Sequence, residues 1–307
     1  MTGVAPPLVG GRQRTHRALH VRRRVNLLYL PAVAVFAVFT VYPLISGILI
    51  SFTKWDGYSP QRAFVGIANY LHLFSDPLVG HALLNTFAYG FGSTILQQVV
   101  GLALALALDR ALRGRNVARA IVYLPVLVSP VVMGTMYYLL FSYSYGGLND
   151  IVTALGGQRV AWLSDAGSAV TIIVLVNSLQ FVGISMVIYL AGLQSIPVMY
   201  HEAARIDGAG AWRRFTGITV PLLQPAFATS VVLNLIGGLK LFDVIRVMTG
   251  GGPGYATDSM STLISKFYFD NQNAGYASAL GVALFLVIAV FTLALNTALN
   301  RRRLEQA

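Results

Sequence analysis

The sequence predicts an all-α integral membrane protein built as a six-span helical bundle. Of its 307 residues, 56% are hydrophobic and only 11% are charged, whereas soluble domains carry about 25% charged residues. Six stretches are apolar over roughly 20 residues, the length that a helix needs to cross the hydrocarbon core of a bilayer. Lipid permits only helices or closed barrels, and the chain shows no ten-residue alternation of polar and apolar residues, so a helical bundle follows.

The expected spans cover residues 25–51, 83–108, 120–141, 169–193, 218–239 and 277–299. Each is apolar on all sides, as a helix surrounded by lipid or buried in a bundle requires. The basic tail 1–24 before the first span resembles the start of a signal peptide. The apolar run that follows is too long for one and lacks a small-residue cleavage site, so we expect a retained helix. A short tail, 300–307, follows the last span.

Basic residues gather on one side of the membrane. Sixteen of the 22 Lys and Arg residues lie in segments 1–24, 109–119, 194–217 and 300–307, and six lie in the opposite loops. Cytoplasmic loops carry the excess of Lys and Arg, so both termini are expected in the cytoplasm. The net charge of +11 is thereby explained by topology, and no nucleic-acid partner is expected.

Three external segments, 52–82, 142–168 and 240–276, are longer than simple turns. The third contains Gly250, Gly251, Gly252 and Pro253, which exclude a continuing helix and predict a compact, specific loop. A flexible linker is the alternative. Tyr and Trp near the membrane boundaries indicate an interfacial belt, although sugar-binding sites also use aromatic faces. These residues are Trp55, Tyr58, Tyr137, Tyr138, Tyr143, Tyr145, Trp162, Tyr255 and Tyr268.

The cytoplasmic segment 194–217 is predicted to form its own helix–turn–helix. A first helix through Ala203 and Ala204 should stop at Asp207-Gly208, because glycine commonly ends helices. In the second helix, Trp212 and Phe215 begin an apolar stripe that leads into the fifth span. An amphipathic helix lying on the membrane surface without a partner is the simpler interpretation.

This segment resembles the EAA loop of binding-protein-dependent ABC importer permeases. The resemblance runs from Glu202 to Pro225 through Ala203-Ala204, Asp207-Gly208-Ala209, Trp212, Phe215, Ile218 and Pro221, with Val220 where Leu is commoner. The approach Ala191 to Pro197, the external Phe242 to Ile245 and the sequence Thr249 to Pro253 are similar to the carbohydrate-uptake branch, to which the maltose permease belongs. The resemblance covers about residues 30 to 300.

The resemblance implies a type I ABC importer permease domain over 80–299 with an EAA coupling loop over 194–225. Its implied partners are a second homologous permease subunit, two ABC ATPase subunits, an external solute-binding protein (a lipoprotein or periplasmic) and membrane lipid. It implies that ATP and Mg are bound by the ATPase subunits, with no cofactor in this chain, in the cytoplasmic (inner) membrane of a prokaryote. The implied ATPase-coupling residues are Glu202, Ala203, Ala204, Asp207, Gly208 and Ala209.

No catalytic or metal site is predicted, so the chain is not expected to be an enzyme. A phosphate-binding Walker loop needs Gly-Lys-Ser/Thr, but the three lysines, Lys54, Lys240 and Lys266, are followed by other residues. His201-Glu202 begins like a zinc-binding HExxH motif, but Arg205 stands in place of the second histidine. The ATPase activity of such an importer therefore belongs to partner subunits.

Polar side chains inside spans are costly and usually face a bundle interior or a path. The wider set is Asn85, Gln97, Gln98, Asn177, Gln180, Ser185 and Asn234, with Asp243 and Arg246 beyond the fifth span. From these we expect Asn177, Gln180, Ser185, Asn234 and Asp243 to line the translocation path, with interhelical hydrogen bonding as the alternative. Leu179 replaces a Trp that similar permeases often carry, so a sugar contact at that position is not expected.

These residues favour an ATP-driven permease subunit that moves a sugar or oligosaccharide by alternating access. The alternative within the class is glycerol-3-phosphate or a glycerophosphodiester, for which Lys240 and Arg246 near the outer mouth could provide positive charge. An ion-coupled secondary carrier is disfavoured because no span contains a buried Asp, Glu or Lys. A membrane scaffold without transport is the remaining alternative.

Overall fold

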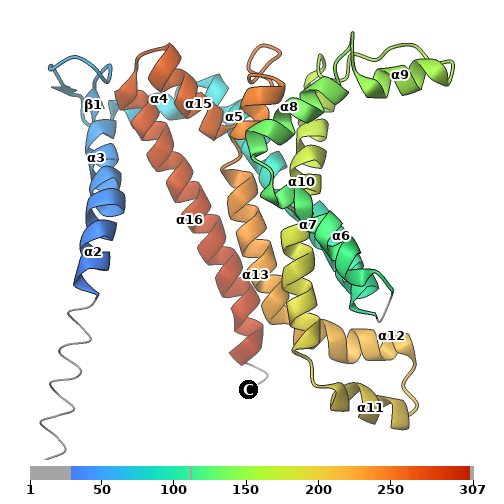
Figure 1. Ribbon diagram of the computed structural model, residues 1–307. Coiled ribbons are helices and arrows are strands. Elements are labelled where there is room, and N and C mark those ends of the chain that lie inside the picture. Colours follow the sequence, from blue (N-terminus) through green and yellow to red (C-terminus); the bar gives the residue numbers. More distant parts are fainter. Residues whose placement is uncertain (1–28, 111–112, 305–307) are drawn as a thin grey trace, which may run out of the picture.

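The computed structural model describes residues 29–110 and 113–304 (Figure 1). The whole of the tail 1–24, residues 25–28 of the expected first span and residues 305–307 of the last tail lie outside the described residues. The end of the molecule that carries residues 198–214 is called the inner end, and the opposite end is called the outer end. These names follow the orientation that the charge distribution predicts.

The first span is one rod of three joined segments. These are α2 (Leu30–Phe36), the π-helix η1 (Ala37–Val41) and α3 (Tyr42–Ser51). The rod stands beside the bundle at the left of Figure 1, and α3 contacts the last helix. A small antiparallel hairpin, β1 (Thr53–Lys54) with β2 (Ala63–Phe64), follows at the outer end, with Thr53 opposite Phe64.

The second span is a 33-residue helical stretch, Pro77–Asp109. Before it, the short helix α4 (Ala68–Ser75) lies at the outer end. The stretch consists of α5 (Pro77–Phe87), the π-helix η2 (Ala88–Gly92) and α6 (Ser93–Asp109). It begins sharply, because Asp76 accepts a hydrogen bond from the Leu78 N–H and Pro77 occupies a first-turn position that tolerates proline.

The expected continuous helix over 120–141 is broken in the structure. It forms α7 (Arg115–Leu127) and α8 (Pro130–Leu140), and the axes of these helices differ by 97°. Proline disfavours a helical conformation in the residue before it, and Ser129 before Pro130 is extended, with φ −56° and ψ 135°. The proline therefore ends the helix that hydrophobicity alone predicted to continue.

The remaining elements complete the bundle and its two ends. After α9 (Gly147–Ala154) at the outer end, α10 (Ala166–Gln194) runs from the outer end down to the inner segment (Figure 1). The inner end holds α11 (Val198–Ile206) and α12 (Ala211–Arg214), from which the π-helix η3 (Phe215–Thr219) leads into α13 (Val220–Leu239). The final elements are α14 (Asp243–Met248), α15 (Met260–Ser265), the π-helix η4 (Lys266–Asp270) and α16 (Ala274–Leu304).

Within the described part of the chain, four helices are long and apolar enough to cross a membrane, or five if the bent pair α7–α8 is one span. The four are Leu30–Ser51, Pro77–Asp109, Ala166–Gln194 and Ala274–Leu299. The expected fifth span, 218–239, corresponds to α13, which is not one of these four helices. Its sequence includes the polar residues Gln224 and Asn234 and the proline Pro225. It lies between α10 and α16 and contacts both (Figure 1).

Small residues allow close packing in the bundle. A Cβ atom added at Gly101 of α6 would lie 2.5 Å from the Cβ of Ser185 on α10. One added at Gly183 would lie 2.9 Å from the Val122 carbonyl oxygen of α7. Without a hydrophobic driving force between helices in lipid, such close backbone contact is a main source of association. The long helix α10 is therefore fixed against both α6 and α7.

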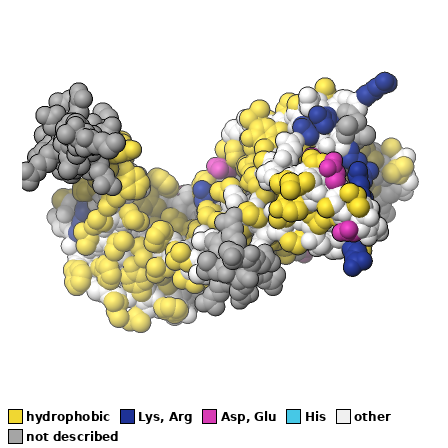
Figure 2. Space-filling model, turned by 90° about the horizontal axis from the view of Figure 1, so that it is seen from below, with side chains coloured by type: hydrophobic (Ala, Val, Ile, Leu, Met, Phe, Trp, Pro, Cys, Tyr) yellow, Lys and Arg dark blue, Asp and Glu magenta, His cyan; other side chains and the backbone are white. Residues whose placement is uncertain are grey.

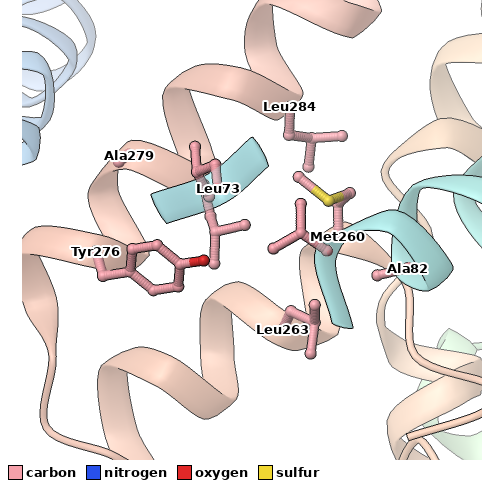
Figure 3. Packing of buried hydrophobic residues seen from close by; sticks show 9 residues of the cluster. Leu73, Ala82, Met260, Leu263, Tyr276, Ala279 and Leu284 are labelled. Carbon is pink, nitrogen blue, oxygen red and sulfur yellow. The ribbon is translucent and has the colours of Figure 1, made fainter. Parts of the chain in front are cut away.

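A buried apolar cluster holds the outer end together (Figure 3). Leu73 of α4, Ala82 of α5, Met260 and Leu263 of α15, and Tyr276 of α16 all point into it. The Tyr276 hydroxyl donates to the Asp76 carboxylate at 2.9 Å. This cluster joins segments that lie about 200 residues apart in the sequence.

Candidate translocation cavity and coupling segment

A cavity of about 370 Å³ lies between α6, α10, α13 and the start of α8 and α14. Its wall combines amide side chains with aromatic and aliphatic ones. The lining residues are Gln97, Pro130, Asn177, Phe181, Ile184, Leu233, Asn234, Gly237, Gly238, Lys240, Leu241, Phe242 and Asp243.

Three of the five predicted path residues line this cavity: Asn177, Asn234 and Asp243. Ser185 lies behind Asn234, because its hydroxyl accepts a hydrogen bond from the Asn234 Nδ2 at 2.5 Å and one from the Ser230 hydroxyl at 3.1 Å. Ser185 therefore supports the cavity wall and does not form it. The alternative role expected for such residues, interhelical hydrogen bonding, applies here.

Gln180 is turned away from the cavity and is fully buried. Its Nε2 donates to the Val128 carbonyl oxygen at 3.1 Å, at the break between α7 and α8. That carbonyl belongs to a residue where the helical hydrogen-bond pattern ends. Gln180 thus fastens the bend, and the bend brings Pro130 into the cavity wall.

Other lining residues carried weaker signals in the sequence. Gln97 was in the wider polar set, and its Nε2 donates to the Asn177 carbonyl oxygen at 3.2 Å. Phe181 and Phe242 are apolar, so polarity could not single them out, and Pro130 enters only through the bend. One helical turn separates Asn177 from Phe181, and this spacing is the signal that could have indicated a shared face.

The charges at the cavity nearly balance. Lys240 and Asp243 both line it, whereas Arg246 lies 3.9 Å from Asp270 and is not part of the lining. One of the two cations considered for anion binding therefore belongs to another contact. The rest of the wall consists of neutral amide groups, two aromatic rings, aliphatic side chains and glycines.

The segment between α10 and α13 forms the predicted helix–turn–helix. Helix α11 ends at Ile206, and Gly208 follows with a left-handed φ of 75°. The Ala209 N–H donates to the Ala204 carbonyl oxygen at 2.8 Å and the Gly208 N–H to the Arg205 carbonyl oxygen at 3.1 Å. These two bonds make a Schellman motif, which closes the end of a helix and fixes the direction of the chain that follows.

The predicted coupling residues form an exposed surface. Glu202, Ala203, Asp207 and Gly208 are exposed, and Ala204 and Ala209 are half-buried. Large apolar side chains accompany them, since Ile206 is 88% exposed and Trp212 is 76% exposed. Seen from the inner end (Figure 2), charged side chains gather on the side of α11 and α12, while much of the remaining visible face is hydrophobic.

The glycine-rich segment is a fastened loop. Gly250 and Gly251 have φ of 60° and 89°, and the Gly252-Pro253 peptide bond is cis. A Cβ at Gly251 would lie 2.0 Å from the Asp258 carboxylate, so only glycine fits there. The Thr257 hydroxyl donates to the Gly252 carbonyl oxygen at 2.7 Å.

Two contacts fix this loop to the rest of the outer end. Asp258, buried to 99%, pairs with Lys266 at 2.7 Å. From α5, the Asn85 Nδ2 donates to the carbonyl oxygens of Ala256 and Asp258 at 2.7 and 3.0 Å. The prediction of a compact, specific loop agrees with these contacts, and a flexible linker does not.

Three comparisons with known proteins agree with this architecture. The family model described as "Binding-protein-dependent transport system inner membrane component" matches residues 98–305. The trehalose/maltose transport system permease protein MalF of Thermococcus litoralis is 37% identical over 267 residues, which cover 87% of this chain and 90% of the relative. The sn-glycerol-3-phosphate transport system permease protein UgpA of Brucella abortus is 33% identical over 271 residues, covering 86% and 90%.

A solved structure supports the same assignment. A bacterial alginate ABC transporter in complex with an alginate pentasaccharide-bound periplasmic protein contains a chain that superposes with a TM-score of 0.80 at 26% identity. The match covers 94% of this chain and 98% of that one. The family match, the relatives and the shared fold together show that this multi-pass membrane protein belongs to the binding-protein-dependent transport system inner membrane components, the permease subunits of type I ABC importers.

Proposed function

We propose that this permease subunit moves a sugar or oligosaccharide, delivered by an external binding protein, across the cytoplasmic membrane by alternating access. The lining of the central cavity carries this proposal. The lining contains the neutral amides of Gln97, Asn177 and Asn234 and the rings of Phe181 and Phe242. Amides can both donate and accept hydrogen bonds, which suits the hydroxyl groups of a sugar, and aromatic rings suit its apolar faces.

The proposed machinery contains further subunits. The partners are a second homologous permease, two ABC ATPase subunits that bind ATP and Mg, and the binding protein outside. Glu202, Ala203, Ala204, Asp207, Gly208 and Ala209 would contact an ATPase subunit. The Schellman motif that ends α11 supports this role, because a rigid helix–turn–helix transmits displacement better than a flexible loop would. ATP hydrolysis would then take place in the partners.

Glycerol-3-phosphate or a glycerophosphodiester is the second candidate substrate. Lys240 at the cavity and the 33% identity to a glycerol-3-phosphate permease favour it. Asp243 in the same lining opposes it, since a carboxylate repels a phosphate. We therefore place the neutral saccharide first.

The experiment that tests the substrate class measures ATP hydrolysis by the complete importer in nanodiscs with its binding protein. Maltose, maltotriose, glycerol-3-phosphate and a glycerophosphodiester are titrated in turn. We expect a sugar to stimulate hydrolysis several-fold and the phosphate compounds to leave the basal rate unchanged. Stimulation by a phosphate compound alone would overturn the sugar proposal in favour of the second candidate.

The coupling assignment needs its own test in the same preparation. Glu202→Lys reverses a charge on the exposed face of α11 without entering the cavity. We expect the Glu202→Lys importer to lose uptake while its spans assemble normally. Arg205→Gln, on the same helix, is the matched comparison, because it removes one charge without reversing it. Normal uptake in the Glu202→Lys importer would sink the coupling role. Uptake that survives ATP depletion with an ion gradient intact would point instead to a secondary carrier.

A further inference from the structure

A second cavity, of about 220 Å³, lies at the outer end and apart from the central one. It is formed where α8 ends and where the chain approaches α10. We call it the outer cleft. Its lining includes four aromatic residues, Tyr138, Phe141, Tyr143 and Trp162, and three serines, Ser142, Ser144 and Ser164.

One buried side chain builds the outer cleft. Asn149 of α9 is completely buried, and its Oδ1 accepts hydrogen bonds from the Val160 N–H at 2.9 Å and the Trp162 Nε1 at 3.1 Å. Its Nδ2 donates to the carbonyl oxygens of Ser142 and Val160 at 3.2 and 3.0 Å. A fully satisfied buried amide of this kind holds its neighbours in one arrangement. The two walls of the cleft are therefore held at a fixed separation.

Arg159 closes the same structure from outside. Its Nη1 donates to the Tyr143 and Ser144 carbonyl oxygens at 2.8 and 3.0 Å, and its Nη2 pairs with Asp150 at 2.9 Å. The guanidinium is thus engaged with the loop itself. None of the residues that line the cleft is charged. An anionic ligand would find no counter-charge in the lining.

Five of the residues that line this cleft carry hydroxyl groups, and most of these residues are exposed. Within residues 29–110 and 113–304, the hydroxyls of Ser142, Ser144 and Ser164 make no intramolecular hydrogen bond, and neither do those of Tyr138 and Tyr143. The backbone around them is already satisfied through Asn149 and Arg159. The cleft therefore offers free hydroxyl donors and acceptors beside aromatic rings, on a backbone that Asn149 and Arg159 hold in place.

The outer cleft and the central cavity share helix α8. Pro130 at its start lines the central cavity, and Tyr138, near its end, lines the outer cleft. Eight residues of helix separate them, which corresponds to about 12 Å along the axis. A ligand in the outer cleft would therefore be offset from the central cavity along α8, which lies across the outer end of the bundle (Figure 1).

We propose that the outer cleft binds one ring of a neutral saccharide before the sugar reaches the central cavity. The proposal rests on the sugar specificity proposed above and assigns a second, outer subsite to it. Aromatic faces and uncharged hydroxyls are the chemistry that a sugar ring requires, and the volume accommodates a single ring. The site is pre-organised, so binding costs little ordering of the protein.

Tryptophan fluorescence tests the subsite directly. The complex of permease and ATPase subunits is purified without its binding protein, in nanodiscs, with Trp55→Phe and Trp212→Phe so that Trp162 is the fluorophore of this chain. Maltotriose is the probe. We expect a saturable change in fluorescence, weakened at least 5-fold by Tyr143→Ala and by Ser144→Ala. Glycerol-3-phosphate should give no saturable change.

Matched variants keep the test specific. Tyr145 is 88% exposed and does not line the cleft, so Tyr145→Ala should leave the maltotriose affinity unchanged. Asn234→Leu alters the central cavity alone and should leave the Trp162 signal in place. Tyr143→Phe keeps the ring and should retain most of the affinity, which separates loss of binding from misfolding.

The outcomes separate this inference from the proposed function. If maltotriose stimulates ATP hydrolysis by the complete importer but gives no saturable Trp162 signal, the outer subsite is wrong and the sugar importer stands. An unchanged affinity in Tyr143→Ala would overturn the subsite equally. If no sugar stimulates hydrolysis and a phosphate compound does, the proposed function fails and the subsite fails with it.

Discussion

Gly208 is the residue on which the geometry of the coupling segment depends. Its φ of 75° lies in the left-handed region, and a Cβ there would meet no atom within 4 Å. The requirement for glycine therefore comes from the backbone and not from crowding. The sequence could predict a helix end at this position, because Asp-Gly after a helical stretch is a common stop signal.

Gly208→Ala should reduce transport by weakening this helix end. A non-glycine residue in the left-handed region costs about 1–2 kcal/mol, so the Schellman bonds should loosen while the spans remain intact. Sugar-stimulated ATP hydrolysis by the complete importer is the measurement. Gly210→Ala is the control, since Gly210 has a φ of −65° and equally open surroundings. Equal activity in the two variants would contradict the role of the turn.

At the scale of elements, the broken third span separates what the sequence could and could not predict. Hydrophobicity predicted one continuous helix over residues 120–141, whereas the structure has two helices, α7 and α8. The 97° bend depends on Pro130 and on where Gln180 lies on another helix. Such a tertiary hydrogen bond has no signature in local spacing. The sequence therefore placed Gln180 in the path, whereas in the structure its side chain bonds the Val128 carbonyl oxygen at the bend.

Gln180→Leu should destabilise the bend and lower uptake together. The partly buried Val128 carbonyl oxygen would lose its partner, and the loss of such a hydrogen bond costs about 0.5–1.5 kcal/mol. Thermal unfolding of the purified importer should shift to lower temperature, and uptake should fall because Pro130 lines the central cavity. Leu179→Ala, next to it but 53% exposed, should change neither quantity. Unaltered stability in Gln180→Leu would refute the fastening role.

The ion pair of the glycine-rich loop gives a second prediction at this scale. Lys266→Met leaves the Asp258 carboxylate buried and without its cation, which costs roughly 3–5 kcal/mol. We expect a clear loss of thermal stability in the assembled complex. The double variant Asp258→Asn with Lys266→Met removes both charges and should recover much of that loss. A double variant as unstable as the single one would show that the pair itself matters little.

For the whole molecule, composition and charge predicted a helical bundle, and the fold agrees. The central cavity was predicted in part. Asn177 and Asn234, which line it, were named as path residues because polar groups stand out in apolar spans, and Asp243 was named as a charge just beyond the fifth span. Phe181, Phe242 and Pro130 could not be named, since apolar residues in a membrane protein carry no comparable contrast. Polarity reveals a lining residue only where its neighbours are apolar.

The orientation in the membrane can be measured with single cysteines, because the chain contains none of its own. Ile206 at the inner end and Tyr145 at the outer end are each 88% exposed. With both termini in the cytoplasm, Tyr145→Cys should react with an impermeant maleimide in cells whose outer barrier is opened, and Ile206→Cys only after the cytoplasmic membrane is disrupted. The reverse pattern would invert the topology.

The fastened glycine-rich loop also has a mechanical consequence. Through Asn85, Asp258 and Lys266, it ties α5 to α15 and η4, and the apolar cluster adds α4 and α16. Elements joined at this many points move as one solid piece. Any rocking of the subunit must therefore occur at the borders of that piece, so spin labels placed within it should keep their spacing throughout the transport cycle.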